Sequence, residues 1–166
     1  MIVTVTLNPS IDRTASLPGP LQRGQVNRLG NSTEVSAGKG VNISRVLCGA
    51  GVDTCAVIPA GTKDRLVTGL ANDKIPHVAV PISASARTNL TITEPDGTTT
   101  KINQPGAALT PDELTAVEEI ILETSTDAEW VVLSGSLPPG VPSNWYTTMT
   151  RRLHETGVKV AVDTSD

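Results

Sequence analysis

The stretch with the clearest capacity for chemistry is residues 36–45, in which Gly38-Lys39-Gly40 runs straight into an apolar, helix-compatible segment. Glycines let the backbone approach a ligand because no Cβ intervenes. The unpaired N–H groups of a helix's first turn attract negative charge, and Lys39 adds a positive one. The stretch therefore predicts an anion-binding helix start, for which a sugar phosphate is a suitable guest.

Two widespread phosphate-binding motifs do not fit this stretch. A Walker A loop has glycine where Thr33 stands, and it has Ser or Thr directly after the lysine, where this chain has Gly40. A Rossmann fingerprint has its third glycine at the position of Ile43. A glycine turn that merely caps an ordinary helix remains the alternative interpretation.

Further motifs recur with this turn in one family. They are Asn8-Pro9-Ser10-Ile11-Asp12, Arg87-Thr88-Asn89, Lys101-Ile102-Asn103-Gln104-Pro105-Gly106 and Ser134-Gly135-Ser136-Leu137-Pro138-Pro139-Gly140. Together they resemble the ribokinase-like (PfkB) carbohydrate kinases over residues 2–165. Within that family they are most similar to the 1-phosphofructokinases, with tagatose-6-phosphate kinases close behind.

The resemblance implies an ATP-dependent phosphotransfer to a sugar phosphate, above all fructose 1-phosphate, which becomes fructose 1,6-bisphosphate. Tagatose 6-phosphate and fructose 6-phosphate are the rival acceptors. Gln104 stands where 1-phosphofructokinases commonly carry Glu, and Gln25 replaces an acidic residue or lysine. Neither change removes a phosphate ligand, so the order of these acceptors is unchanged.

The resemblance also assigns this chain the acceptor-binding residues. Asp12 would accept hydrogen bonds from two neighbouring sugar hydroxyls. Gly38 and Gly40 would supply close backbone approach, and Asn42 would both donate to and accept from hydroxyls. For Asp12 the structural alternative is turn formation, and for Asn42 it is a first-turn residue that satisfies its own helix.

Positive charge for the substrate's phosphate is expected from Lys39, Arg87 and Lys101, each inside a motif. Arg87 can grip a phosphate with two donors, whereas a lysine acts as a mobile point charge. Ser136 follows a predicted parallel strand, where open α/β sheets place ligands. A solvated surface position for each cation, and a hydrogen bond to its own backbone for Ser136, are the alternatives.

The predicted elements alternate between strand and helix, which implies parallel strands joined by right-handed crossovers. Strands are expected over residues 2–7, 13–17, 25–31, 54–58, 78–80, 88–93, 99–103, 131–133 and 158–162, and helices over residues 40–47, 64–71, 111–123 and 144–155. The capping box Thr110-Pro111-Asp112-Glu113 marks one helix start. The predicted fold is α/β: a ribokinase-like layered domain with a mainly parallel central sheet flanked by helices, plus a small β-sheet.

Two segments are too polar for a buried sheet, so a division into two domains is expected. The α/β core comprises residues 1–10, 34–86 and 104–166, and the discontinuous second sheet comprises antiparallel insertions at residues 11–33 and 87–103. The resemblance implies that this second sheet is a lid over the sugar site and the surface of a homodimer. Surface hairpins without function are the alternative.

The composition of the chain excludes some classes of binding partner. With 13 Lys and Arg against 17 Asp and Glu, the net charge of −4 argues against general affinity for nucleic acid or anionic membranes. No apolar run is long enough to span a bilayer and the start lacks a signal peptide's basic region, so a cytoplasmic location is expected. Cys48 and Cys55 are expected to be reduced thiols. His77 and His154 lack the clustering of a metal site.

The chain reaches Asp166 just after a predicted strand, where a further covering helix is expected. The resemblance places the general base and most of the site for ATP and Mg²⁺ beyond Asp166, so no catalytic residue is assigned here. Three functions stay open: the amino-terminal half of a sugar-phosphate kinase, a non-catalytic sugar-phosphate-binding module, and an interaction protein that dimerises through its polar strands.

Overall fold

A five-stranded sheet forms the centre of the protein, seen here in a computed structural model that describes residues 1–164. Its strands lie in the order β5-β4-β1-β8-β9, and all neighbouring pairs are parallel. They are β1 (Ile2–Val5), β4 (Thr54–Pro59), β5 (His77–Val80), β8 (Trp130–Ser134) and β9 (Lys159–Asp163). This arrangement confirms the predicted α/β class with a parallel central sheet.

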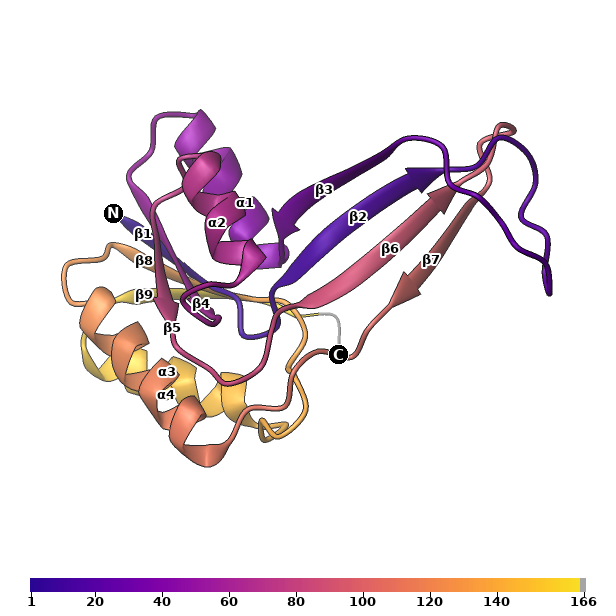
Figure 1. Cartoon of the computed structure of the whole chain (residues 1–166). Helices are drawn as coiled ribbons and strands as arrows, with labels where there is room; N and C mark the ends of the chain where they lie inside the picture. Colours follow the sequence, from indigo (N-terminus) through magenta and orange to yellow (C-terminus); the bar gives the residue numbers. More distant parts are fainter. Residues whose placement is uncertain (165–166) are drawn as a thin grey trace.

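Helices cover both faces of this sheet (Figure 1). One face carries α1 (Lys39–Gly49) and α2 (Arg65–Asn72), and the other carries α3 (Pro111–Thr124) and α4 (Trp145–Glu155). Side chains alternate between faces along a strand, so β4 directs Val57 into the α3–α4 layer and Ile58 into the α1–α2 layer. Among the described residues, no helix has the length and apolarity needed to cross a bilayer.

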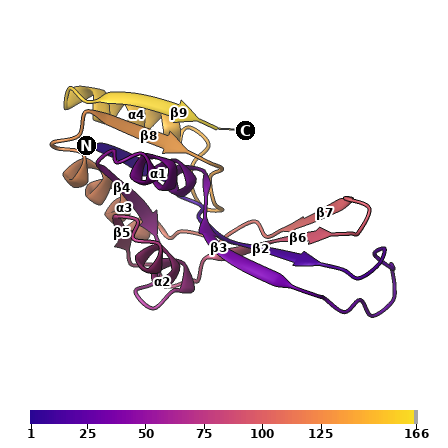
Figure 2. The same ribbon diagram turned by 90° about the horizontal axis from the view of Figure 1, so that it is seen from above.

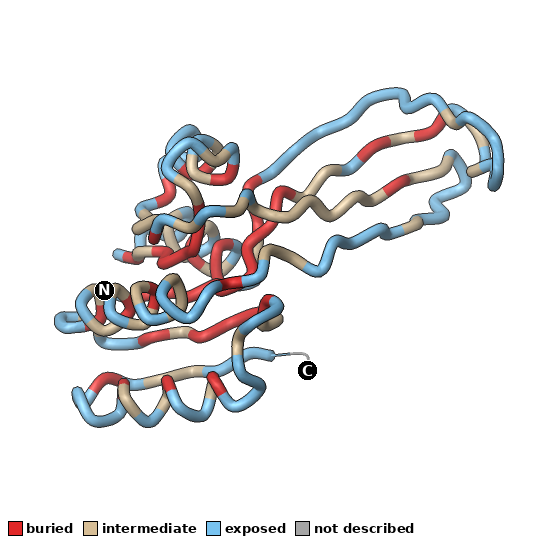
Figure 3. Tube along the Cα trace, turned by 60° about the horizontal axis from the view of Figure 1, so that its bottom comes forward, coloured by how far each residue is buried: buried red, intermediate tan, exposed pale blue. Residues whose placement is uncertain are grey.

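A separate four-stranded sheet, called here the small sheet, projects from one end of the central one (Figures 1 and 2). Its order is β3-β2-β6-β7, with β2 (Ser10–Ser16), β3 (Ser32–Ala37), β6 (Arg87–Thr93) and β7 (Thr99–Asn103). Two antiparallel hairpins, β2–β3 and β6–β7, join through a parallel β2–β6 pair. Burial is concentrated in the central part of the molecule, and most of the small sheet is exposed or half-buried (Figure 3).

The structure corrects details of the second sheet. The strand expected over residues 25–31 is wrong: the Asn27 side chain bonds to the backbone of Gln22 and Gln25, which closes a local loop, and strand β3 begins at Ser32. Residues 34–37, assigned to the core range, pair within the small sheet. The insertions are antiparallel internally, but they meet in parallel. The last two residues of the core range lie outside the described residues, and the domain division itself stays a prediction.

Helix α3 begins with the predicted capping box. The Thr110 hydroxyl accepts from the Glu113 N–H, and the Glu113 carboxylate accepts from the Thr110 N–H. The Ser83 N–H donates to the other carboxylate oxygen of Glu113. These bonds, with Thr110 the larger contributor and Ser83 next, lower the pKa of Glu113 from 4.5 to about 2.

Acid should therefore weaken the fold in part through Glu113. Its carboxylate is protonated at a lower pH in the folded chain than in the unfolded chain, so its contribution is complete above the unfolded pKa and is lost as pH falls toward about 2. Urea unfolding between roughly pH 5.5 and pH 3 should show a shallower loss of stability for Glu113→Gln than for the natural chain. Glu119→Gln, at an exposed position of the same helix, is the control. Equal slopes for the natural chain and Glu113→Gln would contradict this expectation.

Candidate functional site

The glycine turn lies directly on the carboxyl end of β1. Gly38 has a φ of 132°, and a Cβ there would stand 2.7 Å from Thr6 Cγ2. A Cβ at Gly40 would stand 2.8 Å from the Val5 carbonyl oxygen. Thr6 Oγ1 accepts the Val41 N–H at 3.1 Å, which caps the helix from the neighbouring strand. The missing side chains thus let the start of α1 sit against the sheet edge.

Lys39 extends from this turn along the same edge. Its Nζ lies 3.5 Å from Asp163 Oδ1 at the end of β9, and Asp163 Oδ2 accepts from the Ser134 hydroxyl at 3.1 Å. Asn42 follows in the first turns of α1, with its side chain exposed. The ends of β8 and β9 and the start of α1 therefore surround one polar region.

Asn8, just beyond β1, ties two loops to this edge. Its Nδ2 donates to the Pro105 carbonyl at 3.0 Å and to Ser136 Oγ at 3.1 Å. The Tyr146 hydroxyl donates to the Gly135 carbonyl at 2.6 Å, which steadies the same loop after β8. Asn8 belongs to the opening motif but received no role from sequence, because its partners are remote in the chain.

Asp12 lies on one face of the small sheet beside Asn89, its register partner. Asp12 Oδ1 accepts from Asn89 Nδ2 at 3.0 Å and from Ser10 Oγ at 2.7 Å. Period-two alternation signals that Ser10 and Asp12 share a face. Asn89 could not be added from sequence, because the β2–β6 register follows from tertiary pairing.

Arg87 opens β6 on the same face as Asp12. Its Nη1 donates to the Gln104 carbonyl at 3.1 Å, while its buried Nε has no partner within the described chain. Burial lowers the pKa of the guanidinium, and the nearby Asp12 carboxylate opposes that shift. Arginine nevertheless stays protonated in proteins, so a half-buried cation with an unused donor faces the polar side of the sheet.

Lys101 shares this face but lies farther out. It is exposed on β7 opposite Thr91, and no ion pair forms around it within residues 1–164. The eight predicted residues thus fall into two groups: Gly38, Lys39, Gly40, Asn42 and Ser136 at the edge of the central sheet, and Asp12, Arg87 and Lys101 on the small sheet.

Ser10 is where the two groups meet. In β2 it pairs with Ala37, immediately before the glycine turn, on one side and with Arg87 on the other. Arg87 is thus the register partner of Ser10 on β6, and Gly38 directly follows Ala37, the register partner of Ser10 on β3. The start of α1, the Asp12 carboxylate and the Arg87 guanidinium therefore belong to one candidate site.

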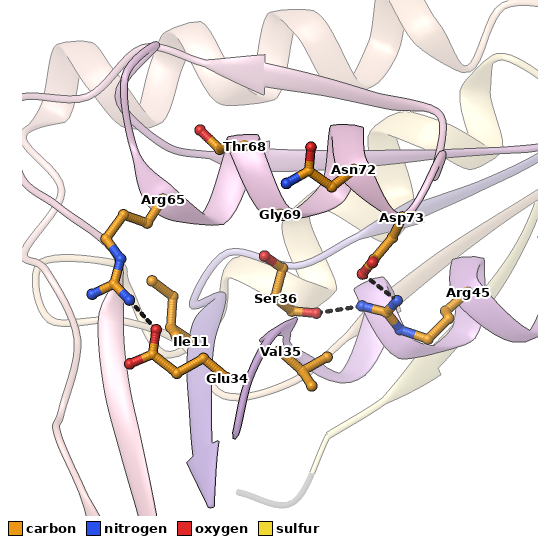
Figure 4. A pocket seen from close by; sticks show the side chains of 10 residues that line it. All are labelled: Ile11, Glu34, Val35, Ser36, Arg45, Arg65, Thr68, Gly69, Asn72 and Asp73. Atoms are coloured by element: carbon orange, nitrogen blue, oxygen red, sulfur yellow. Dashed lines mark hydrogen bonds and ion pairs between the residues drawn. The ribbon is translucent and has the colours of Figure 1, made fainter. Parts of the chain in front are cut away.

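One well-formed cavity lies elsewhere. It has a volume of about 470 Å³ and opens between β3, α1 and α2, away from all eight predicted residues (Figure 4). Its two arginines are each paired with a carboxylate, Arg45 with Asp73 and Arg65 with Glu34. Within the described residues, no three His, Cys, Asp or Glu side chains gather as a metal site.

Comparison with known proteins identifies the family. The pattern of the pfkB family carbohydrate kinases matches residues 5–166. The chain belongs to this family. It is 34% identical to the ATP-dependent 6-phosphofructokinase isozyme 2 of Escherichia coli K12, covering 99% of this chain and 53% of that protein. It is 32% identical to the 1-phosphofructokinase of Rhodobacter capsulatus, with 99% and 53% covered.

The solved structures agree. A crystal structure of phosphofructokinase-2 from Escherichia coli, in complex with substrates and products, superposes with a TM-score of 0.91 at 32% identity. The match covers 99% of this chain and 54% of that one. This pfkB-family chain therefore spans about half the length of the curated relatives it matches.

Gly40→Ala should destabilise the protein, because a methyl group would meet the Val5 carbonyl and push α1 off the sheet edge. We expect a loss of about 1–3 kcal/mol in the free energy of unfolding. Gly49→Ala in the same helix is the matched control, since a Cβ there meets no atom within 4 Å. It should stabilise by up to about 1 kcal/mol. A Gly40→Ala variant as stable as Gly49→Ala would contradict the close approach of α1 to β1.

Proposed function

We propose that this chain supplies the acceptor-binding half of an ATP-dependent sugar-phosphate kinase. The observation that carries the proposal is the meeting of Asp12, Arg87 and the start of α1 around Ser10. Such a group combines a carboxylate for hydroxyls, a cation for a phosphate, and open helix N–H groups. Phosphotransfer depends mainly on positioning and electrostatics, which these groups can provide.

Each residue then has a distinct task. Asp12 has Oδ1 occupied by Ser10 and Asn89, so its other oxygen, Oδ2, can accept from sugar hydroxyls. Arg87 would bind the substrate's phosphate through guanidinium N–H groups that its Nη1 bond to the Gln104 carbonyl leaves free. Lys39 would leave the exposed Asp163 carboxylate for the phosphate, since a pair so open to water is weak.

The remaining predicted residues would complete the acceptor site. Gly38 and Gly40 would bring backbone N–H groups to the ligand, and Asn42 and Ser136 would bind hydroxyls or phosphate oxygens. Lys101 would add charge from the outer part of the small sheet. All of these lie on the two surfaces that converge at Ser10.

Fructose 1-phosphate is the acceptor we favour, with formation of fructose 1,6-bisphosphate. Relatives named 1-phosphofructokinase and 6-phosphofructokinase match at similar identity, so fructose 6-phosphate is the main alternative and tagatose 6-phosphate the next. These acceptors share a ketohexose and one phosphate. The shared chemistry is what Asp12 and Arg87 would recognise.

ATP with Mg²⁺ would be the phosphoryl donor, held mostly by residues beyond Asp166 together with the general base. We also propose that the small sheet acts as a lid and as the surface of a homodimer. The face opposite Asp12 carries the exposed apolar side chain of Ile102, which a second copy could cover. Acceptor recognition and phosphate donation would thus lie on different halves of the whole kinase.

Arg87→Ala should weaken recognition of the phosphate far more than recognition of the sugar. In a protein that contains this chain at the length of its relatives, we expect kcat/KM for fructose 1-phosphate to fall roughly tenfold to a hundredfold, the range for a lost charged hydrogen bond. The value for unphosphorylated fructose should change little. Arg13→Ala is the matched control, because Arg13 lies on the opposite face of β2, paired with Glu34. Equal losses on both substrates would remove Arg87 from the phosphate site.

The 166-residue chain alone should transfer no phosphate from ATP to fructose 1-phosphate above background, even with Mg²⁺. It should also tend to aggregate, because β9 forms an edge of the central sheet and leaves Val162 46% exposed. A coupled assay with light scattering measures both properties. A monodisperse chain that turns over fructose 1-phosphate would contradict the assignment of the base to the other half.

A further inference from the structure

Three side-chain oxygens hold the chain where it enters the small sheet, two of them on the linker before β6 and one on β6 itself. This linker, residues 81–86, connects β5 to Arg87 at the start of β6. In each contact a backbone N–H donates to a side chain: Ser83 to Glu113 Oε1 at 2.7 Å, Ala86 to Asp64 Oδ2 at 2.7 Å, and Thr88 to Gln104 Oε1 at 2.8 Å. The residue between the last two contacts is Arg87, whose backbone is therefore restrained on both sides.

Two of these acceptors also cap helices. Asp64 is the N-cap of α2 and accepts the Leu66 N–H through Oδ1 at 2.9 Å. Glu113 accepts the Thr110 N–H through Oε2 at 2.9 Å. Each carboxylate thus uses one oxygen for its own helix and the other for the linker.

Helix capping by itself does not require a carboxylate at either position. Asn is as good an N-cap as Asp, and Gln can replace Glu in a capping box. An amide has only one oxygen, so it could serve the helix but would turn an N–H donor toward the linker's N–H. A carboxylate is therefore needed at these two positions only for its second oxygen, which accepts the N–H of the linker.

The two carboxylates reach the linker from opposite sides. Helix α2 lies on one face of the central sheet and α3 on the other, with the linker passing between their N-terminal ends (Figure 1). Hydrogen bonds from N–H groups to ionised acceptors are shorter and stronger than neutral ones. Both core layers therefore restrain the backbone immediately before Arg87.

We propose that Asp64 and Glu113 are positioning residues for Arg87. By fixing the linker from both layers, they set where the guanidinium meets the phosphate of the acceptor, an inference that rests on the proposed function. Small displacements of a binding group can cost much of its effect on a bound substrate. Neither carboxylate needs to touch the ligand for this role.

Asp64→Asn and Glu113→Gln test the proposal, because each keeps a helix cap and removes one linker contact. Calorimetric titration with fructose 1-phosphate, on a protein that contains this chain at the length of its relatives, should show affinity about three- to thirtyfold lower for each variant. In an Arg87→Ala background the same substitutions should cause no further loss, since their effect passes through Arg87. Amide hydrogen exchange at Ala86 should quicken in Asp64→Asn, and at Ser83 in Glu113→Gln.

Asp112→Asn is the matched control, because it removes a carboxylate from the same first turn of α3 without a linker contact. It should leave affinity and exchange unchanged. Natural affinity in both variants, or a loss that persists in the Arg87→Ala background, overturns the positioning role. Failure of the natural chain to bind fructose 1-phosphate overturns the proposed function and this role together. Amide exchange reports on the linker without any ligand. Faster exchange at Ala86 and Ser83 in the variants would show that the carboxylates restrain the linker even if fructose 1-phosphate does not bind, and unchanged exchange would show that they do not.

Discussion

The close approach of α1 to β1 is the contact on which the candidate site depends. Gly40 leaves room for the Val5 carbonyl, and Thr6 caps the helix from the strand. Below this point the interface uses small hydroxyl side chains: Ser44 bonds to Thr4 at 2.7 Å and to Thr54 at 2.9 Å, and all three are buried. These hydroxyls satisfy one another, so burial does not leave unpaired polar groups. A bulkier apolar layer would lift the helix start away from the sheet edge.

The parallel pairing of β2 with β6 is the second determinant, because it joins the two hairpins into one surface with distinct faces. Asp12, Arg87 and Lys101 lie on one face, and Arg13 with Glu34 on the other. The small sheet is attached to the core near Ser10 and by the linker before Arg87. The charges of Asp12 and Arg87 therefore lie where the small sheet leaves the core, while the outer part of that sheet is exposed (Figure 3).

Sequence predicted the elements whose signals are local. The Thr110–Glu113 capping box, the strands expected over residues 88–93 and 99–103, and the strands of the central sheet lie close to where they were expected. No strand forms over residues 25–31, where one was expected; the Asn27 side chain instead bonds to the backbone of Gln22 and Gln25. The alternation of polar and apolar residues does not show whether a side chain such as Asn27 will bond to the nearby backbone.

The sequence alone determined the α/β class, the pfkB resemblance and the eight residues suited to an acceptor, because residue type and short spacing encode them. The tertiary structure decided which of those residues meet. Register placed Asn89 against Asp12, and Ser10 between Ala37 and Arg87. The packing of α2 and α3 beside the linker gave Asp64 and Glu113 a second hydrogen bond each. These partners are between 20 and 80 residues apart in the chain. The entropy cost of closing a loop changes only slowly with its length, so spacing in the sequence does not select one distant partner over another, and the folded structure decides which residues meet.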